Sequence, residues 1–398
     1  MNARTGAVRI AAFSLILLLV ALWIQELRRS GTDAGVLNRD WRAFHRAGAL
    51  LWEGRHRDIY PLSFDTDYPF LYPPCLLYPC AVLGLLPPTW AYGCCVLVAL
   101  LAVVASLGVF RIWMPGRRGD YVTAALVVLA SAPWNGIMVV GQITPLFVLA
   151  LAAGFGAWRK QRLLTAGLIL SLLMIKPNLG AVVGLVVLAR GGRRMVLGLV
   201  IGWTGLLAST LPLGVAMWED YFAASALMAD VVSSNAMPMW KHQTLYAFWW
   251  TVPGIDVSAR WVQLLWAMSV VPIAAGAILV WARRVRAERV PRLLGVTVLF
   301  LVAANPYCYF YDGLLLLIPG VIWYVERGRY AHAQCHRICG LCLLGIFVWQ
   351  HLSLFVLKEF GPWALVGPVA WVWCMVEVVD LTVGARRRSS DASLAAVP

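Results

Sequence analysis

The sequence predicts an all-α protein that crosses a membrane many times. Hydrophobic residues make up 61% of its 398 residues and charged residues only 13%, whereas an average soluble domain carries roughly 25% charged residues. So few polar groups cannot cover a globule with a water-facing surface, which excludes a soluble enzyme and a disordered chain. Apolar runs of about 20 residues recur, as membrane-spanning helices require, whereas a β-barrel would show short alternating segments.

The apolar runs define the predicted spans. They are residues 8–27, 90–112, 121–139, 143–158, 163–189, 195–216, 260–282, 293–304, 311–325, 337–357 and 362–383. Run 8–27 has no small-residue cleavage site after it, so we interpret it as an uncleaved first span. Run 163–189 contains Lys176-Pro177-Asn178. Because proline breaks a helix and a lysine is costly at mid-membrane, we expect two short helices with a turn at Lys176. Segment 71–88 holds two Pro-Pro pairs and suits a helix on the membrane surface.

Basic residues gather in short clusters between these runs and set the predicted topology. With the N-terminus in the cytoplasm, twelve spans result, and 22 of the 33 Lys and Arg residues lie in cytoplasmic segments, as the positive-inside rule requires. This topology explains the net charge of +14 without a nucleic-acid partner. The predicted organisation is one transmembrane domain at 1–385, with outer loops 28–89 and 217–259, and a disordered cytoplasmic tail at 386–398.

Cysteine usage adds one open question. The nine cysteines are an odd number and lie mostly in apolar runs, where cysteine acts as a small hydrophobic residue. Cys335, Cys339 and Cys342 recur at helical spacing beside His332 and His336. This face could hold a metal, although the segment leads directly into an apolar run and also suits a plain helix start.

Polar residues other than charge clusters gather on the predicted outer face. In the first outer loop, Asp40 lies among aromatic residues just beyond the first span. Such an aspartate could act as a general base at a membrane surface. The alternative is a surface aspartate paired with Arg39 or Arg42.

Five further motifs follow Asp40 in order. They are Gly54-x-x-x-x-Ile59-Tyr60 with Tyr72-Pro73-Pro74, Gly141-Gln142-Ile143-Thr144, Ala166-Gly167-Leu168 with Lys176-Pro177, His242-Gln243-Thr244-Leu245-Tyr246, and Asn305-Pro306-Tyr307 with Tyr311-Asp312. In this order, over roughly residues 10–330, the chain resembles the integral-membrane glycosyltransferases of family 87, which have the GT-C fold.

The resemblance implies an inverting transfer of a hexose, often mannose, from a polyprenyl-phosphate donor to a lipid or glycan acceptor. The reaction would take place on the outer face of the cytoplasmic (inner) membrane, with both termini in the cytoplasm. Asp40 matches the aspartate assigned as catalytic base. Actinobacterial mannosyltransferases of the family tend to carry histidine near the late Pro-containing turn, where this chain has Tyr309, Tyr311 and Asp312.

A lipid-phosphate donor needs a cation for its phosphate, and Lys176 at an outer turn could supply it; the alternative is a snorkelling lysine. Gln142 either binds substrate or only forms a turn, and His242 and Gln243 either bind phosphate or sugar hydroxyls or lie in a solvated loop. The remaining predicted substrate contacts are Tyr72, Tyr311 and Asp312.

One carboxylate suffices for this reaction, because a phosphate leaving group needs no protonation, whereas glycosidases need two. We also expect no required cofactor, and a divalent metal stays open. Asp65 and Asp67 have the spacing of a metal-binding pair, but we interpret them as loop residues. The competing functions are a secondary transporter, a lipid-linked-glycan ligase or polymerase, and a lipid-carrier flippase. A transporter or a flippase would have no use for a base at Asp40.

Overall fold

Helices make up all the regular secondary structure of the residues that the structure describes, as the composition predicts. Within these residues an isolated β-bridge joins His242 to Tyr309. The computed structural model describes residues 39–60, 69–114, 116, 118–233, 239–252, 259–282, 287–355, 357 and 364–394. The predicted first span, 8–27, and the pair Asp65 and Asp67 lie outside the described residues.

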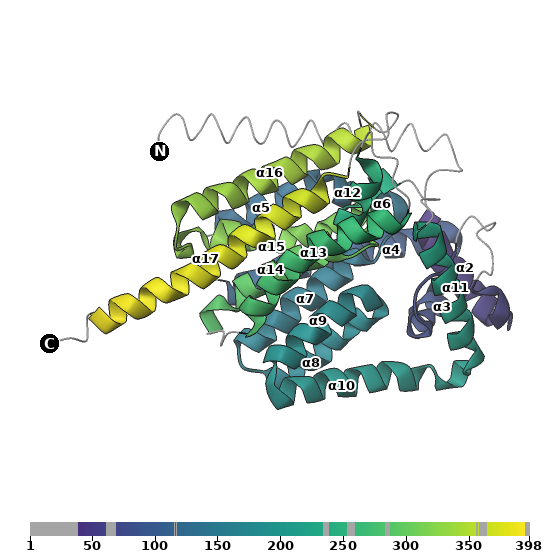
Figure 1. Ribbon diagram of the computed structural model, residues 1–398. Helices are drawn as coiled ribbons and strands as arrows, with labels where there is room; N and C mark the ends of the chain where they lie inside the picture. The colour runs from purple at the N-terminus through teal and green to yellow at the C-terminus, as the bar shows by residue number, and fades with distance from the viewer. Residues whose placement is uncertain are drawn as a thin grey trace.

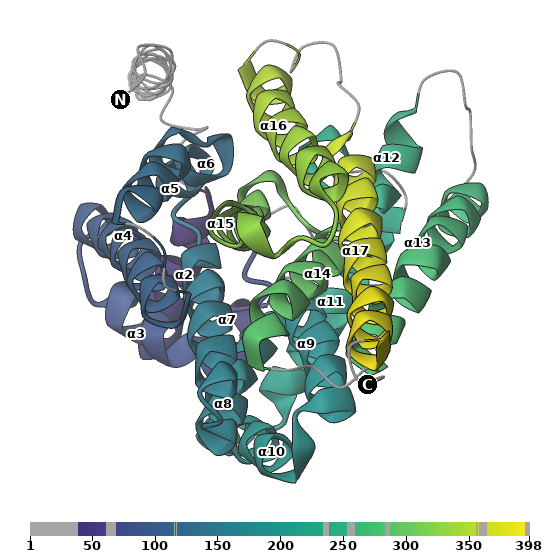
Figure 2. The same ribbon diagram turned by 90° about the vertical axis from the view of Figure 1, so that its left-hand side faces the viewer.

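Figures 1 and 2 show the arrangement of the helices. The α-helices are α2 (Arg39–Trp52), α3 (Leu77–Gly84), α4 (Pro88–Trp113), α5 (Arg118–Ala130), α6 (Ala132–Val140), α7 (Thr144–Arg159), α8 (Leu163–Leu170), α9 (Pro177–Arg190), α10 (Gly192–Ser209), α11 (Ala216–Ser233), α12 (Leu245–Thr251), α13 (Ala259–Ala282), α14 (Val290–Ala304), α15 (Leu317–Val325), α16 (Ala333–Phe355) and α17 (Val366–Leu394). The 3-10 helices are η1 (His56–Asp58), η2 (Pro74–Leu76), η3 (Ser171–Ile175), η4 (Leu211–Leu213), η5 (Met239–Lys241), η6 (Ala287–Arg289), η7 (Phe310–Leu316) and η8 (Arg327–Arg329). Helix α17 extends to Leu394, and the disorder of the tail 386–398 stays a prediction.

Within the described residues, four helices are long and apolar enough to cross a membrane: α4, α10 with its extension to Leu213, α13, and α16 as far as Ser353. The bent pair α5 and α6 makes a fifth candidate if it counts as one span. Five apolar helices of 10–17 residues accompany them. Membrane helices are therefore present, while the predicted number of twelve spans stays a prediction.

Several apolar runs are interrupted by local backbone chemistry. Run 163–189 divides into α8, η3 and α9, and Pro177 begins α9 directly after Lys176, as the sequence predicts. Run 121–139 is not the single helix that its composition suggests, because α5 and α6 meet at an angle of 57°. The Ser131 hydroxyl accepts a hydrogen bond from the Trp134 amide at 3.3 Å and so caps a new helix.

The two predicted outer loops contain helices that pack against each other. Helices α2, α3 and α11 lie together at the right of Figure 1. Their shared hydrophobic cluster includes Phe44, Tyr60 and Leu77 from the first loop and Tyr221 from the second. Helices α2 and α3 cross closely at Gly48, where a Cβ atom would lie 1.8 Å from a backbone oxygen of Cys80.

Helix α14 occupies the centre of the bundle. Figure 2 shows α9, α15 and α17 around it, and all its residues except Phe300 are buried. Its first turn carries Arg292, and its last residue leads into the segment 305–312. Because an α-helix rises 1.5 Å per residue, these two ends are about 20 Å apart. Each end carries a cluster of buried charged side chains.

Candidate active site

The candidate site forms where helix ends and breaks converge. The first turn of α2 supplies Asp40, and the turn after α6 supplies Gln142. Gly141 closes α6 in the left-handed region, at φ 71°, where glycine avoids the steric cost of a side chain. A Cβ atom at Gly141 would lie 2.6 Å from Cβ of Trp41. The turn therefore needs glycine both for its conformation and for its contact with α2.

Asp40 is held by a chain of hydrogen bonds. Nε2 of Gln142 donates to Oδ2 of Asp40. Oε1 of Gln142 accepts from the Tyr72 hydroxyl at 2.9 Å and from the Ile143 amide at 3.2 Å. Since both donors face the amide oxygen, the amide nitrogen is left to face Asp40.

The environment of Asp40 makes its carboxylate more basic than usual. Burial raises the pKa of Asp40 and outweighs the hydrogen bonds from Gln142 and Tyr311, which lower that pKa together with the charge of Lys176. The Gln142 group that donates to the Asp40 carboxylate is a neutral amide and not a cation. A carboxylate in such surroundings is better suited to accept a proton than one held by an arginine.

Lys176 and Asp312 form a buried ion pair beside Asp40. Nζ of Lys176 lies 2.5 Å from Oδ1 of Asp312, and the two residues are 8% and 1% exposed. The Thr144 hydroxyl donates to the same Oδ1 at 2.9 Å, and the Tyr309 amide donates to Oδ2 at 3.1 Å. Lys176 is therefore a paired cation, whereas its turn position alone suggests a lone one.

His242 lies in an aromatic setting close to this pair. Its ring centroid is 5.1 Å from that of Tyr307 and 5.0 Å from that of Tyr309. The residue is 1% exposed, and neither ring nitrogen has a hydrogen-bond partner among the described residues. Burial, together with the charges of Lys176 and Lys241, lowers the pKa of His242 to about 3. The imidazole is therefore neutral at physiological pH.

Gln243 forms hydrogen bonds to two other parts of the chain. Its backbone N–H donates to the Cys308 carbonyl at 2.8 Å. Its side-chain Oε1 accepts from Nε2 of Gln350 on α16 at 2.7 Å. Gln243 thus joins the segment 241–244 to both the 305–312 segment and α16.

The structure brings most of the residues predicted from sequence into one cluster. Asp40, Gln142 and Tyr72 form one hydrogen-bonded chain, and Lys176 and Asp312 form the adjacent pair. Burial raises the pKa of Tyr72 well above its usual value, and the charges of Asp40 and Asp312 raise it further, so both carboxylates lie in the region of the Tyr72 hydroxyl. His242 borders this region, and Gln243 lies at its edge beside Gln350.

Sequence reasoning missed three contributors to this cluster. Thr144 lies within the Gly-Gln-Ile-Thr motif, so the motif itself contained the signal. Tyr307 accepts a hydrogen bond from Nδ2 of Asn178 through its carbonyl at 3.1 Å, and it contacts His242. Gln350 is a polar residue inside the apolar run 337–357, which is itself unusual enough to indicate a buried partner.

Comparison with known proteins supplies one match. A family model described as glycosyltransferase family 87 matches residues 70–306. The matched segment includes Tyr72, Gln142, Lys176, His242 and Gln243, whereas Asp40 precedes it and Tyr311 and Asp312 follow it. Neither the curated proteins nor the solved structures contain a match to the chain.

Proposed function

The chain belongs to glycosyltransferase family 87, and on that premise we propose that it moves a hexose, with mannose the first choice, from a polyprenyl-phosphate donor to a lipid or glycan acceptor. It is a glycosyltransferase with membrane-spanning helices. The proposed site faces the outer side of the cytoplasmic membrane, since the basic clusters favour a topology with both termini in the cytoplasm.

The observation that supports this mechanism is the setting of Asp40. In the proposed reaction the acceptor hydroxyl attacks the anomeric carbon, and Asp40 takes the hydroxyl proton. The bond between the anomeric carbon and the phosphate oxygen breaks, and polyprenyl phosphate leaves with the bonding electrons. The configuration inverts in one displacement. The raised pKa of Asp40 supports a base role, because proton transfer is most effective when the pKa of the base approaches the working pH.

Lys176 would act on the leaving phosphate. Its ammonium group is buried beside Asp312, where a positive charge acts more strongly than in water. In the proposal, Thr144 holds Asp312, and Asp312 in turn orients the Lys176 ammonium group. Lys176 shares its charge with the phosphate as the bond to the sugar breaks. In this proposal the positive charge that faces the departing phosphate comes from Lys176, so the step invokes no metal or other cofactor.

His242 is better suited to a sugar hydroxyl than to the phosphate. With its pKa at about 3, the ring carries no charge that would attract phosphate. A neutral imidazole offers one donor and one acceptor, and both ring nitrogens lack a partner among the described residues. Gln243, Tyr72 and Tyr311 complete the proposed substrate contacts.

The test is sugar transfer by the full chain in nanodiscs. Labelled polyprenyl-phosphate mannose is supplied with a membrane-lipid extract, and wild type is compared with Asp40→Asn. We expect label in a new product, with a rate lower by roughly 10²–10⁴ in Asp40→Asn, the range of general-base catalysis. Asp58→Asn is the matched control, because Asp58 is an exposed aspartate of the same loop, bonded to Arg55.

Each outcome separates class from mechanism. Undiminished transfer by a folded Asp40→Asn variant would remove Asp40 from the base role while leaving the enzyme class intact. If wild type transfers no label from any of a panel of polyprenyl-phosphate hexoses, the proposed donor class is wrong. Label appearing only in a lengthening polysaccharide would favour the ligase or polymerase alternative.

A further inference from the structure

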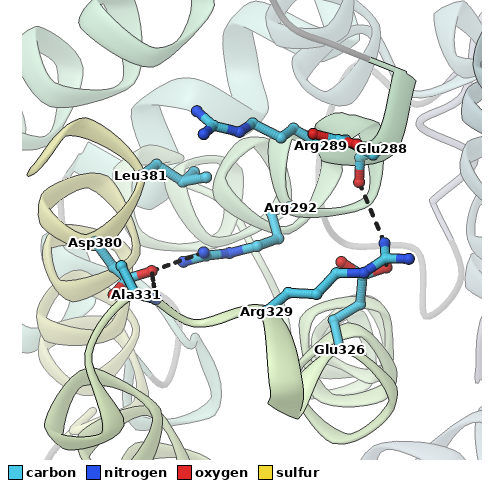
Figure 3. A pocket seen from close by; sticks show the side chains of 8 residues that line it. All are labelled: Glu288, Arg289, Arg292, Glu326, Arg329, Ala331, Asp380 and Leu381. Atoms are coloured by element: carbon cyan, nitrogen blue, oxygen red, sulfur yellow. Dashed lines mark hydrogen bonds and ion pairs between the residues drawn. The ribbon is translucent and has the colours of Figure 1, made fainter. Parts of the chain in front are cut away.

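A second cluster of buried charges lies at the opposite end of α14 from Asp40. Arg292, in the first turn of α14, donates from Nε and Nη2 to Oε2 of Glu377 at 2.9 and 2.5 Å, and from Nη1 to Oδ2 of Asp380 at 2.7 Å. All three residues are 5% exposed or less. Figure 3 shows Arg292 pointing toward Asp380 on α17. This cluster takes no part in the proposed sugar transfer.

The hydrogen bonds seen among the described residues connect Glu377 and Asp380 through one guanidinium. Arg292 is shared between two carboxylates. The remaining hydrogen bonds to Glu377 come from the Tyr330 hydroxyl and the Cys339 thiol, which are neutral groups. Nη1 of Arg329 lies 2.7 Å from Oε1 of Glu326 and forms an ion pair with that carboxylate.

The groups beside Asp380 are typical metal ligands. His332 precedes α16, Cys335 lies in its first turn, and Asp380 faces both from α17. Nδ1 of His332 is 3.2 Å from Oδ1 of Asp380. One ligand atom each from His332, Cys335 and Asp380 lie within 4.8 Å of one another. Zinc binds such atoms at roughly 2.0–2.3 Å in a tetrahedron, so two ligand atoms of one ion are about 3.4–3.6 Å apart. The most distant pair would therefore have to approach by up to about 1 Å.

The surrounding contacts hold the carboxylate in place for this role. Oδ2 of Asp380 accepts from Arg292 and from the Ala331 amide at 3.2 Å. Oδ1 accepts from the His332 amide at 3.0 Å and lies 3.2 Å from Nδ1 of the same residue, and the Cys335 side chain is hydrogen-bonded to the same carboxyl group. The spacing His-x-x-Cys places both side chains on one face at the start of α16. His336 does not join them, because its ring stacks on Trp323 with centroids 4.9 Å apart.

We propose that His332, Cys335 and Asp380 bind one Zn²⁺ ion, which joins the start of α16 to α17. Nitrogen, thiolate and carboxylate donors together suit zinc. The partly exposed His332 and Cys335 leave a fourth position for water. Cys339 and Cys342, which share the helical face with Cys335 in the sequence, do not take part.

The test measures metal binding by the full chain, independently of sugar transfer. Purified protein in detergent, stripped with a chelator, is titrated with Co²⁺ as a spectroscopic substitute for Zn²⁺. We expect one equivalent to bind with a thiolate-to-cobalt charge-transfer band, and Zn²⁺ to displace it. Cys335→Ser should abolish the band, and His332→Gln should weaken binding at least tenfold. His336→Gln and Cys94→Ser are the matched controls and should bind as wild type does.

A second measurement needs no variant. Zn²⁺ should slow alkylation of Cys335, followed by mass spectrometry of its peptide, while alkylation of Cys94 stays unchanged. The proposal is overturned if wild type shows no thiolate band, if Cys335→Ser keeps it, or if Zn²⁺ leaves the alkylation of Cys335 unchanged. It is equally overturned if His336→Gln weakens binding as much as His332→Gln. Failure of sugar transfer would not affect any of these results.

Discussion

Replacing Gln142 with methionine tests how the site sets the basicity of Asp40. The substitution preserves the length of the side chain and removes the amide that donates to Oδ2 of Asp40. That hydrogen bond favours the ionised carboxylate, so its loss favours the protonated form and raises the pKa of Asp40 further. The acid limb of the profile of kcat/KM against pH, which reports ionisations of the free enzyme, should therefore move to higher pH.

The size of the shift follows from the energy of one hydrogen bond. A hydrogen bond to a charged group contributes about 1.5–3 kcal/mol, and one pKa unit corresponds to about 1.4 kcal/mol. The lost bond would thus raise the pKa by at most about two units. Asp40 is only partly buried, so water replaces some of the lost interaction. Tyr311 and Lys176 continue to lower the pKa. We expect a shift of about one unit.

The assay is the initial rate of sugar transfer at low donor concentration over a range of pH. Two comparison variants separate the bond from its setting. Tyr72→Phe removes the donor to Oε1 of Gln142 but keeps the Ile143 amide on the same oxygen, so a smaller shift is expected. Gln350→Met alters a glutamine that bonds Gln243 and should leave the acid limb in place.

Two results would refute this reasoning. An acid limb that stays in place in Gln142→Met, with the rate lower at every pH, would mean that Gln142 only orients substrate. An acid limb that moves to lower pH would mean that Asp40 is not the group that titrates.

Two further predictions concern backbone and charge. Gly141→Ala should lower both the thermal unfolding temperature and the rate of sugar transfer, because the new Cβ atom would meet Trp41 at 2.6 Å. Gly54→Ala is the control, since Gly54 has the same φ of 71° but nothing within 4 Å of its Cβ position. Equal losses of unfolding temperature in the two variants would refute the role of the Trp41 contact. Lys176→Met leaves Asp312 buried without its cation and should destabilise the fold by about 3–5 kcal/mol, whereas adding Asp312→Asn should restore part of that loss. Thermal unfolding of the single and double variants measures the two effects. If the destabilisations of the two single variants simply add in the double variant, the pairing is contradicted.

Features that depend on residues adjacent in the chain could be predicted from the sequence. The break after Lys176 follows from Pro177, and the helical content follows from composition. The break at Ser131 was missed because the apolar composition of run 121–139 conceals a serine cap followed by a proline. The number of spans depends on how far each broken helix is tilted and displaced by its neighbours, which hydropathy does not encode.

The partners within the candidate site depend on tertiary packing. Gln142 is 102 residues from Asp40, and Lys176 is 136 residues from Asp312. The sequence singled out all four residues, but nothing in their spacing tells which amide meets which carboxylate. The pairing of Lys176 with Asp312 became visible only with the fold, and it changes the role expected of the lysine from a free cation to a shared one.

The two charged clusters at the ends of α14 use the same kind of side chain for different purposes. Asp380 is bonded by a guanidinium and two backbone amides, and a cation on a carboxylate weakens it as a base while fixing its position. Asp40 is bonded by the neutral amide of Gln142, which orients the carboxylate and leaves it able to take a proton. The placement of cations therefore separates the two roles: the lysine of the candidate active site is bonded to Asp312, and Asp40 is left as the basic carboxylate.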